Sequence, residues 1–394
     1  MKRNQQLAMV LALAVLSALP ALAQNSRIYR DGNGWVEEIS GTLPASRALK
    51  VNTDVGSIQL NGGNDADIKY TIKKHSYASS EDSARQAFQQ FGVTVRRRGD
   101  EAGIEGSWEG GRGRKFNAEF ILVVPRATQL VKLNSDGGAI KVAGLSGHLE
   151  AETGGGEVHL DDIASALAET GGGAINVGNA SGELKLTTGG GNINVSSASA
   201  GVTLESGGGS VWVGSAGMAN VETGGGSVKV ERCMGHAEVQ TGGGGIELGQ
   251  TNGPVTVETG GGSIHLAGAT GPVHVETGGG GMELWKLANG VRAETGGGSI
   301  TAELIGTPQS SSSLETTAGD LTVYISPNVK VSIKAEIDTA FGHRINSDFP
   351  ELKITSEGGD YGPKNITAVG NINGGGQVLR LETNIGNINI RRGK

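Results

Sequence analysis

The most regularly spaced residues that could take part in chemistry are glutamates in the middle of the chain. Each precedes a Thr or Ser that opens a run of glycines, and they recur with a nearly constant spacing. Apart from interruptions at Thr187 and Gln240, the column consists of Glu152, Glu169, Glu205, Glu222, Glu258, Glu276 and Glu294. Carboxylate oxygens are the ligands that calcium prefers, so this column could bind cations.

The alternative is that these carboxylates are solvated. The known calcium-binding repeat has an Asp after Gly-Gly-x-Gly, and the corresponding positions here mostly hold Ser, Gly, Asn or Ala. We therefore expect solvated glutamates and neither a resident cofactor nor a metal, with calcium as the alternative cofactor.

Two tryptophans are candidate ligand contacts. Trp212 and Trp285 alternate with apolar residues, so they point outward if their segments are strands. An exposed indole stacks on a sugar ring or fills a partner's pocket; the alternative is packing under the next bend. The predicted ligand-binding residues for a glycan, matrix or cell-envelope partner are Trp212, Trp285, Glu222, Glu258, Glu276 and Glu294.

The chain carries no signature of catalysis or of nucleic-acid binding. It has no G-x-x-x-x-G-K phosphate loop and no G-x-S-x-G elbow, and the adjacent Asp161 and Asp162 would point to opposite faces of a strand. The net charge is −7, and residues 151–305 hold 16 acidic and 5 basic side chains, which disfavours phosphate partners. Its single cysteine, Cys233, cannot form an internal disulfide and is expected to be a buried structural thiol. We expect a non-enzymatic protein.

The elements that would position these residues repeat with the same period. A Thr or Ser opens the glycine run at 153, 170, 188, 206, 223, 241, 259, 277 and 295. Val255, Val257 and Thr259 alternate onto one face before the glycines, and Ile264 and Leu266 do so after them. This alternation, nested inside the longer period, predicts stacked coils. The predicted fold is all-β: a single-chain β-solenoid (β-helix) of about 18-residue coils, with a small α+β N-terminal cap carrying one helix.

The glycine runs predict the corners of these coils. The alternation turns the Thr side chains inward, where their hydroxyls would bond stacked backbone groups. Glycine tolerates positive φ and has no side chain to clash with the same corner of the next coil. The predicted structural corners include Thr153, Thr170, Thr223, Thr259, Thr277, Thr295, Gly261 and Gly279.

The chain divides into four segments. Residues 1–23, with Lys2, Arg3, an apolar run and Ala21-Leu22-Ala23, predict a signal peptide, and hence export to the periplasm, cell envelope or exterior. No transmembrane segment is expected after its cleavage. Residues 24–130 predict the cap, and residues 131–305 the regular Gly-rich repeats. Residues 306–394 predict irregular C-terminal coils and a closing cap, because the interval between corners lengthens before the next expected corner, Thr317.

Within the cap, helical spacing of apolar residues predicts one amphipathic helix over about residues 80–91. Ser79 is the expected N-cap, with Asp82 three residues on as in a capping box, and Gly92 is the expected stop.

Four short stretches outside the glycine runs resemble a known family. They are Val124-Pro125-Arg126-Ala127-Thr128, Thr317-Ala318-Gly319-Asp320-Leu321, Asn346-Ser347-Asp348-Phe349-Pro350 and Glu382-Thr383-Asn384-Ile385-Gly386-Asn387-Ile388. From about residue 40 onward the chain resembles the bacterial exported β-strand-repeat proteins called "putative adhesins". The resemblance implies adhesion and transfers no catalytic residues. A purely structural or self-associating envelope element is the alternative, and a carbohydrate-active enzyme on a β-helix is a third reading; the sequence leaves the oligomeric state open.

Overall fold

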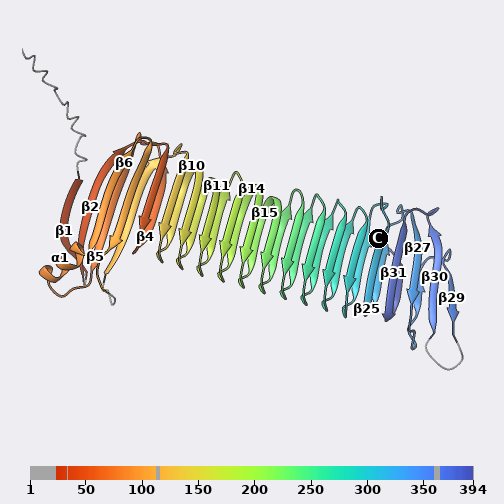
Figure 1. The fold of residues 1–394 in the computed structure, drawn as a ribbon. Coiled ribbons are helices and arrows are strands. Elements are labelled where there is room, and N and C mark those ends of the chain that lie inside the picture. The colour runs from red at the N-terminus through yellow and green to blue at the C-terminus, as the bar shows by residue number, and fades with distance from the viewer. Residues whose placement is uncertain (1–23, 33, 112–115, 359–363, 394) are drawn as a thin grey trace, which may run out of the picture.

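The computed structural model describes residues 24–32, 34–111, 116–358 and 364–393. The predicted signal peptide, residues 1–23, lies outside these residues. Over the described ranges the protein is all-β with a single helix, as predicted, and its strands stack side by side along one axis (Figure 1). That helix is too short to cross a membrane, and no other helix occurs in the part of the chain described.

The N-terminal part contains the strands that precede the regular repeats. Its elements are β1 (Gln24–Asp31), β2 (Gly34–Pro44), β3 (Ala48–Thr53), β4 (Ser57–Gly63), β5 (Asp67–Ser76), α1 (Glu81–Gln89), β6 (Phe91–Arg98), β7 (Glu101–Trp108) and β8 (Phe116–Pro125). Antiparallel pairing joins β1 to β2, β2 to β5, β5 to β8 and β6 to β7. Parallel pairing then joins β3 to β9 (Leu130–Ser135) and β4 to β10 (Ile140–Thr153), so this part continues directly into the repeats.

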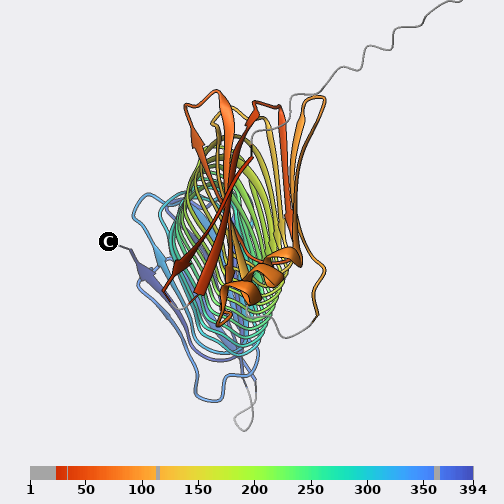
Figure 2. The ribbon, with the colours of Figure 1, turned by 90° about the vertical axis from the view of Figure 1, so that its left-hand side faces the viewer.

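Helix α1 begins one residue later than predicted. Its N-cap is Ser80, whose hydroxyl accepts a hydrogen bond from the Ser83 backbone N–H at 3.3 Å. The prediction of Ser79 with Asp82 is therefore wrong, because the third helical residue is Ser83 and no capping box forms. The helix ends at Gln89, capped by Gln90, before Gly92 is reached. Figure 2 shows α1 at the N-terminal end of the stack.

The repeats form two sides, one on each side of the glycine triplets. We call the strand segments that end at a corner Thr or Ser the pre-glycine side and the strand segments that directly follow the glycines the post-glycine side. The longest strands, of 13 or 14 residues, contain one segment of each side. The remaining strands of this region are β11 (Val158–Thr170), β12 (Ile175–Ala180), β13 (Leu184–Thr188), β14 (Ile193–Ser206), β15 (Val211–Thr223), β16 (Val228–Cys233), β17 (Ala237–Thr241), β18 (Ile246–Thr251), β19 (Val255–Thr259), β20 (Ile264–Ala269), β21 (Val273–Thr277), β22 (Met282–Leu287), β23 (Val291–Thr295) and β24 (Ile300–Leu304).

Every strand of these repeats pairs in parallel with its counterpart one repeat later. On the pre-glycine side Val255 pairs with Val273, and Val273 pairs with Val291. On the post-glycine side Ile264 pairs with Met282, at the same interval along the chain. Side chains that alternate inward from both sides are buried and form one continuous apolar core. The interval between paired residues along the chain therefore equals the period of the sequence repeat.

The glycine triplets do not have the backbone conformation that the sequence suggested. Gly261 and Gly279 are absent from the glycines with positive φ, and a Cβ on either would meet nothing within 4 Å. The expectation that positive φ requires glycine at these two positions is wrong. The predicted clash with the next coil does occur at the flanking glycines, because a Cβ on Gly260 or Gly262 would overlap a carbonyl oxygen of the preceding repeat. The close approach of stacked backbones therefore explains the outer two glycines, and not the middle one.

At the C-terminal end the stacking order departs from chain order. The strands are β25 (Ser312–Ala318), β26 (Leu321–Ile325), β27 (Val331–Ile337), β28 (Ile345–Ser347), β29 (Lys353–Glu357), β30 (Asn365–Ile372), β31 (Val378–Ile385) and β32 (Ile388–Arg392). Strand β31 inserts between β25 and β27, and β32 between β26 and β28. Strands β27, β30 and β29 then pair antiparallel. Thr295 pairs with Thr316, so the corner residue is Thr316 and not the predicted Thr317.

Candidate functional site

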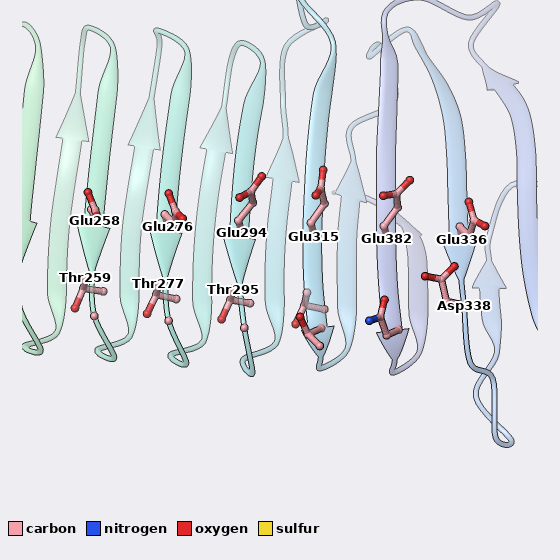
Figure 3. A pocket seen from close by; sticks show the side chains of 16 residues that line it. Glu258, Thr259, Glu276, Thr277, Glu294, Thr295, Glu315, Glu336, Asp338 and Glu382 are labelled. Atoms are coloured by element: carbon pink, nitrogen blue, oxygen red, sulfur yellow. The ribbon is translucent and has the colours of Figure 1, made fainter. Parts of the chain in front are cut away.

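The predicted glutamates lie on the outer surface of the pre-glycine side. Glu258 pairs directly with Glu276, and Glu276 with Glu294. Strand pairing continues this row beyond the predicted column through Glu315 and Glu382 to Glu336, so that six successive strands each contribute one glutamate. We call these six residues, Glu258, Glu276, Glu294, Glu315, Glu382 and Glu336, the acidic row. Figure 3 shows their carboxylates side by side.

The acidic row lines a groove of about 800 Å³ at the C-terminal end of the stack. Corner threonines lie along its lower border, and Asp338 adds a seventh carboxylate beside Glu336. Neighbouring strands lie about 4.8 Å apart, so the carboxylates are close enough to repel one another. A rigid backbone therefore holds a linear array of negative charge with a fixed repeat.

Two arginines compensate part of this charge. The Arg292 guanidinium donates to the Glu294 carboxylate at 2.6 Å, and the Arg380 guanidinium contacts Glu382 at 3.0 Å. The hydrogen bond with Glu294, and then its charge, raise the pKa of Arg292. Glu258, Glu276 and Glu315 have no ion pair with any described residue. Glu336 likewise has no ion pair within the described ranges and accepts a hydrogen bond only from the neutral Asn365 amide, so the uncompensated charge of the row lies on four of its six side chains.

Calcium binding by the row would need ligands from several strands. No group of three or more His, Cys, Asp or Glu side chains in the described ranges is arranged to hold a metal ion. Each strand supplies one carboxylate, and the groove is open to solvent on its outer face. A cation would therefore bridge neighbouring glutamates, and no preformed cage surrounds it.

The predicted ligand-binding residues do not form one site. Glu222 lies on the same side as the acidic row, separated from Glu258 by Gln240. Trp212 and Trp285 lie on β15 and β22 of the post-glycine side, the other side of the stack. Four strand steps, roughly 19 Å, separate the two indoles along the stack.

Both tryptophans are half-buried and have intramolecular partners. The Trp212 indole N–H donates to the Glu231 carboxylate at 3.3 Å. The Trp285 ring stacks against Tyr324, with centroids 6.1 Å apart and an interplanar angle of 29°. Strand pairing places Tyr324 beside Glu303 and Arg391. Both indoles therefore contact side chains of other strands and not a bend.

The corner threonines form a hydrogen-bonded column inside the stack. The Thr259 hydroxyl donates to the Gly244 carbonyl of the preceding repeat at 2.9 Å and accepts from the Gly262 N–H at 3.2 Å. The other predicted corner threonines, Thr153, Thr170, Thr223, Thr277 and Thr295, make the same two bonds. These side chains are buried, and their hydroxyls are engaged with the backbone.

Glu315, Glu382 and Glu336 were not predicted from the sequence as members of the glutamate column, for two reasons. Taking Thr317 as the corner would place Thr316 in the column, whereas the pairing places Glu315 there. Glu382 precedes Glu336 in the stack although it follows it in the chain. The signal that could have found Glu382 is the Glu-Thr pair at 382–383, which repeats the Glu-Thr of the glycine corners.

Comparisons with known proteins give distant structural likenesses. No protein-family model matches the chain, and no curated protein matches it. A "putative cell adhesion protein" from Clostridium sporogenes aligns at 11% identity over 95% of this chain and 100% of its own, with a TM-score of 0.17. A "putative adhesin" from Bacteroides fragilis aligns at 13% identity over 78% and 98%, with a TM-score of 0.24. Another from Parabacteroides distasonis aligns at 14% identity over 75% and 98%, with a TM-score of 0.24. Likeness at this level assigns neither a family nor a function to this chain.

Proposed function

We propose that this chain is an exported, non-enzymatic adhesin that binds a glycan, matrix or cell-envelope partner through its acidic row. The observation that carries the proposal is the in-register series of six glutamates on consecutive strands. Like charges on adjacent strands destabilise a sheet, so a row of this length costs stability and calls for a role. Binding a partner with regularly spaced cationic groups, or binding through bridging calcium, would supply that role.

The test is binding of purified residues 24–394 to an array of glycans, matrix proteins and envelope components, with calcium and with chelator. The decisive variant is the quadruple Gln substitution of Glu258, Glu276, Glu315 and Glu336, which removes the charge without an ion pair and keeps the arginine-paired Glu294 and Glu382. The control is a quadruple Gln substitution of Glu101, Glu157, Glu183 and Glu351, which removes the same net charge from exposed positions outside the row. Loss of binding in the first variant alone is expected; equal binding by both would refute the proposal.

The scaffold of this proposal is a single-chain β-solenoid of about 18-residue coils. The nearly constant interval between paired strands on both sides supports it. Export follows from the predicted signal peptide, and N-terminal sequencing of the mature protein from its host is expected to begin at Gln24. A chain that retains residues 1–23 would contradict export through that signal.

A purely structural envelope element is the second candidate. The continuous apolar core and the threonine column favour it, because both make the stack stiff whether or not a ligand binds. For a structural element we expect no specific binding to any component of the array, and a mechanically weaker envelope when the gene is deleted. The enzyme alternative is tested separately by product release from a polysaccharide panel, where we expect none.

A further inference from the structure

Four described strands have a hydrogen-bonded neighbour on one edge only. They are β1 and β6 at the N-terminal end and β28 and β29 at the C-terminal end. An unpaired strand edge is a template for pairing with another chain unless charge, length or cover prevents it. The four edges differ in how far they are protected.

Three of these edges carry a feature that opposes pairing. Strand β6 ends in Arg96, Arg97 and Arg98, which would place like charges near one another in a second copy. Strand β28 has only three residues. Strand β1 carries two arginines, Arg27 and Arg30, whose like charges oppose pairing with a second copy. Strand β29 has none of these features.

Strand β29 is the most exposed strand of the C-terminal end. All five of its residues, Lys353-Ile354-Thr355-Ser356-Glu357, are exposed, and its only strand partner is β30. The Ile354 side chain is 45% exposed although it points to the core side of the sheet, opposite the buried Ala368. Lys353 and Glu357 have no ion pair with any described residue.

We propose that β29 pairs antiparallel with β29 of a second copy of this chain and joins two molecules end to end. The strand is self-complementary about Thr355. With Thr355 opposite its own counterpart, Lys353 lies opposite Glu357 of the other copy, and the same pair recurs on the other side of the twofold axis. Ile354 then lies opposite Ser356, and the two Ile354 side chains become diagonal neighbours on one face. A closed twofold interface of this kind yields a dimer and stops there.

The position of β29 in the fold permits this arrangement. Figure 1 shows β29 as the outermost strand at the C-terminal end, so two stacks joined there would extend away from each other. Pairing would continue the β27–β30–β29 sheet into the second molecule. A five-residue strand buries less than the roughly 1,000 Å² of a stable interface, so the dimer is weak and concentration-dependent. The inference is independent of the lateral binding site, because it uses the end of the stack.

Sedimentation equilibrium of residues 24–394 over a wide concentration range tests the pairing. The wild-type chain is expected to be in monomer–dimer equilibrium, and Lys353→Glu, which places four acidic side chains around the twofold axis, is expected to be monomeric. The double variant Lys353→Glu with Glu357→Lys restores opposite charges and is expected to dimerise again. A wild-type monomer at every concentration, a Lys353→Glu dimer, or a double variant that stays monomeric would each overturn the proposal.

A cross-link tests the register. In a Cys233→Ser background, Thr355→Cys places two thiols opposite each other across the axis, so mild oxidation is expected to give a covalent dimer. Thr42→Cys, at an exposed position on β2, which is paired on both edges, is the matched control and is expected to remain monomeric. Equal cross-linking of both variants, or none of Thr355→Cys, would refute the β29 interface.

Discussion

The Thr277 hydroxyl donates a hydrogen bond at 2.9 Å to the Gly262 carbonyl, which belongs to the preceding repeat. The same oxygen accepts the N–H of Gly280 in its own repeat at 3.2 Å. One buried side chain therefore connects two successive corners and satisfies a donor and an acceptor that the close-packed glycines leave without a partner. Repeated at each corner, this pair of bonds fixes the position of each repeat relative to the next along the axis of the stack.

Thr277→Val is expected to destabilise the stack. Valine keeps the shape of threonine but leaves the Gly262 carbonyl and the Gly280 N–H unsatisfied, which costs about 1–3 kcal/mol. The shift of the urea unfolding midpoint measures the loss. Thr277→Ser is the control, because Ser206 makes the same two bonds at its own corner. Equal midpoints for the Val and Ser variants would show that the hydroxyl is dispensable.

Adding a methyl group distinguishes the outer glycines of a triplet from the middle one. Gly262→Ala places a Cβ against the Gly244 carbonyl oxygen, and the resulting shift of packed backbone is expected to cost about 1–3 kcal/mol. Gly261→Ala faces open space and lacks a positive φ, so its unfolding free energy should change by less than about 0.5 kcal/mol. Chemical denaturation of both variants checks the difference. A Gly261 variant as unstable as the Gly262 variant would contradict the stacking geometry.

The sequence was sufficient for features that repeat and insufficient where the repeat ends. Alternation of Val255, Val257 and Thr259 predicted their inward position because a strand has a strict two-residue period. The insertion of β31 between β25 and β27 had no comparable signal, because long-range strand order depends on which edge remains open after the last regular repeat. Glu382 and Glu336 were hidden for that reason, and Glu315 was missed because Thr317 was taken as the corner. The two tryptophans were assigned an outward direction correctly, but their contacts with Glu231 and Tyr324 depend on neighbours in the stack.

Removing one whole repeat is expected to leave a folded, shorter protein. Deletion of residues 260–277 joins Thr259 to Gly278 and removes one strand from each side, so every remaining side chain keeps its direction. Deletion of residues 260–268 removes half of that length. Strands of the pre-glycine side would then have to pair with strands of the post-glycine side. Far-UV circular dichroism and thermal unfolding compare the two. A cooperative transition in the half-repeat deletion, or its loss in the whole-repeat deletion, would argue against the proposed coil length.

Cys233 is expected to be unreactive in the folded protein. The side chain is 1% exposed, and burial raises the pKa of its thiol, so the thiolate population at neutral pH is small. Its sulfur also contacts the His236 carbonyl at 3.3 Å. A chromogenic disulfide reagent at pH 8 should label it slowly in buffer and rapidly in urea. Rapid labelling of the native chain would show that the turn around Cys233 opens readily.

The charge repulsion along the acidic row can be measured through Glu276, which lies between Glu258 and Glu294. Glu276→Gln removes two like-charge neighbours and is expected to raise the unfolding free energy by roughly 0.2–1 kcal/mol at low salt. The gain should vanish near 1 M salt, where the screening length is about 3 Å. Glu294→Gln is the contrast, because it also removes the Arg292 contact and should bring no gain.

Calcium gives the Glu276 experiment a second readout. If the row binds a bridging cation, calcium stabilises the wild-type chain more than Glu276→Gln, which loses the two bridges that involve Glu276, since ligand binding to the folded state adds to its stability. The gain of Glu276→Gln over the wild-type chain then shrinks or reverses between chelator and millimolar calcium. If the carboxylates are only solvated, the variant stays more stable by the same margin under both conditions. Unfolding midpoints of the wild-type chain and Glu276→Gln, each with chelator and with calcium, therefore distinguish a cation-binding acidic row from a solvated one.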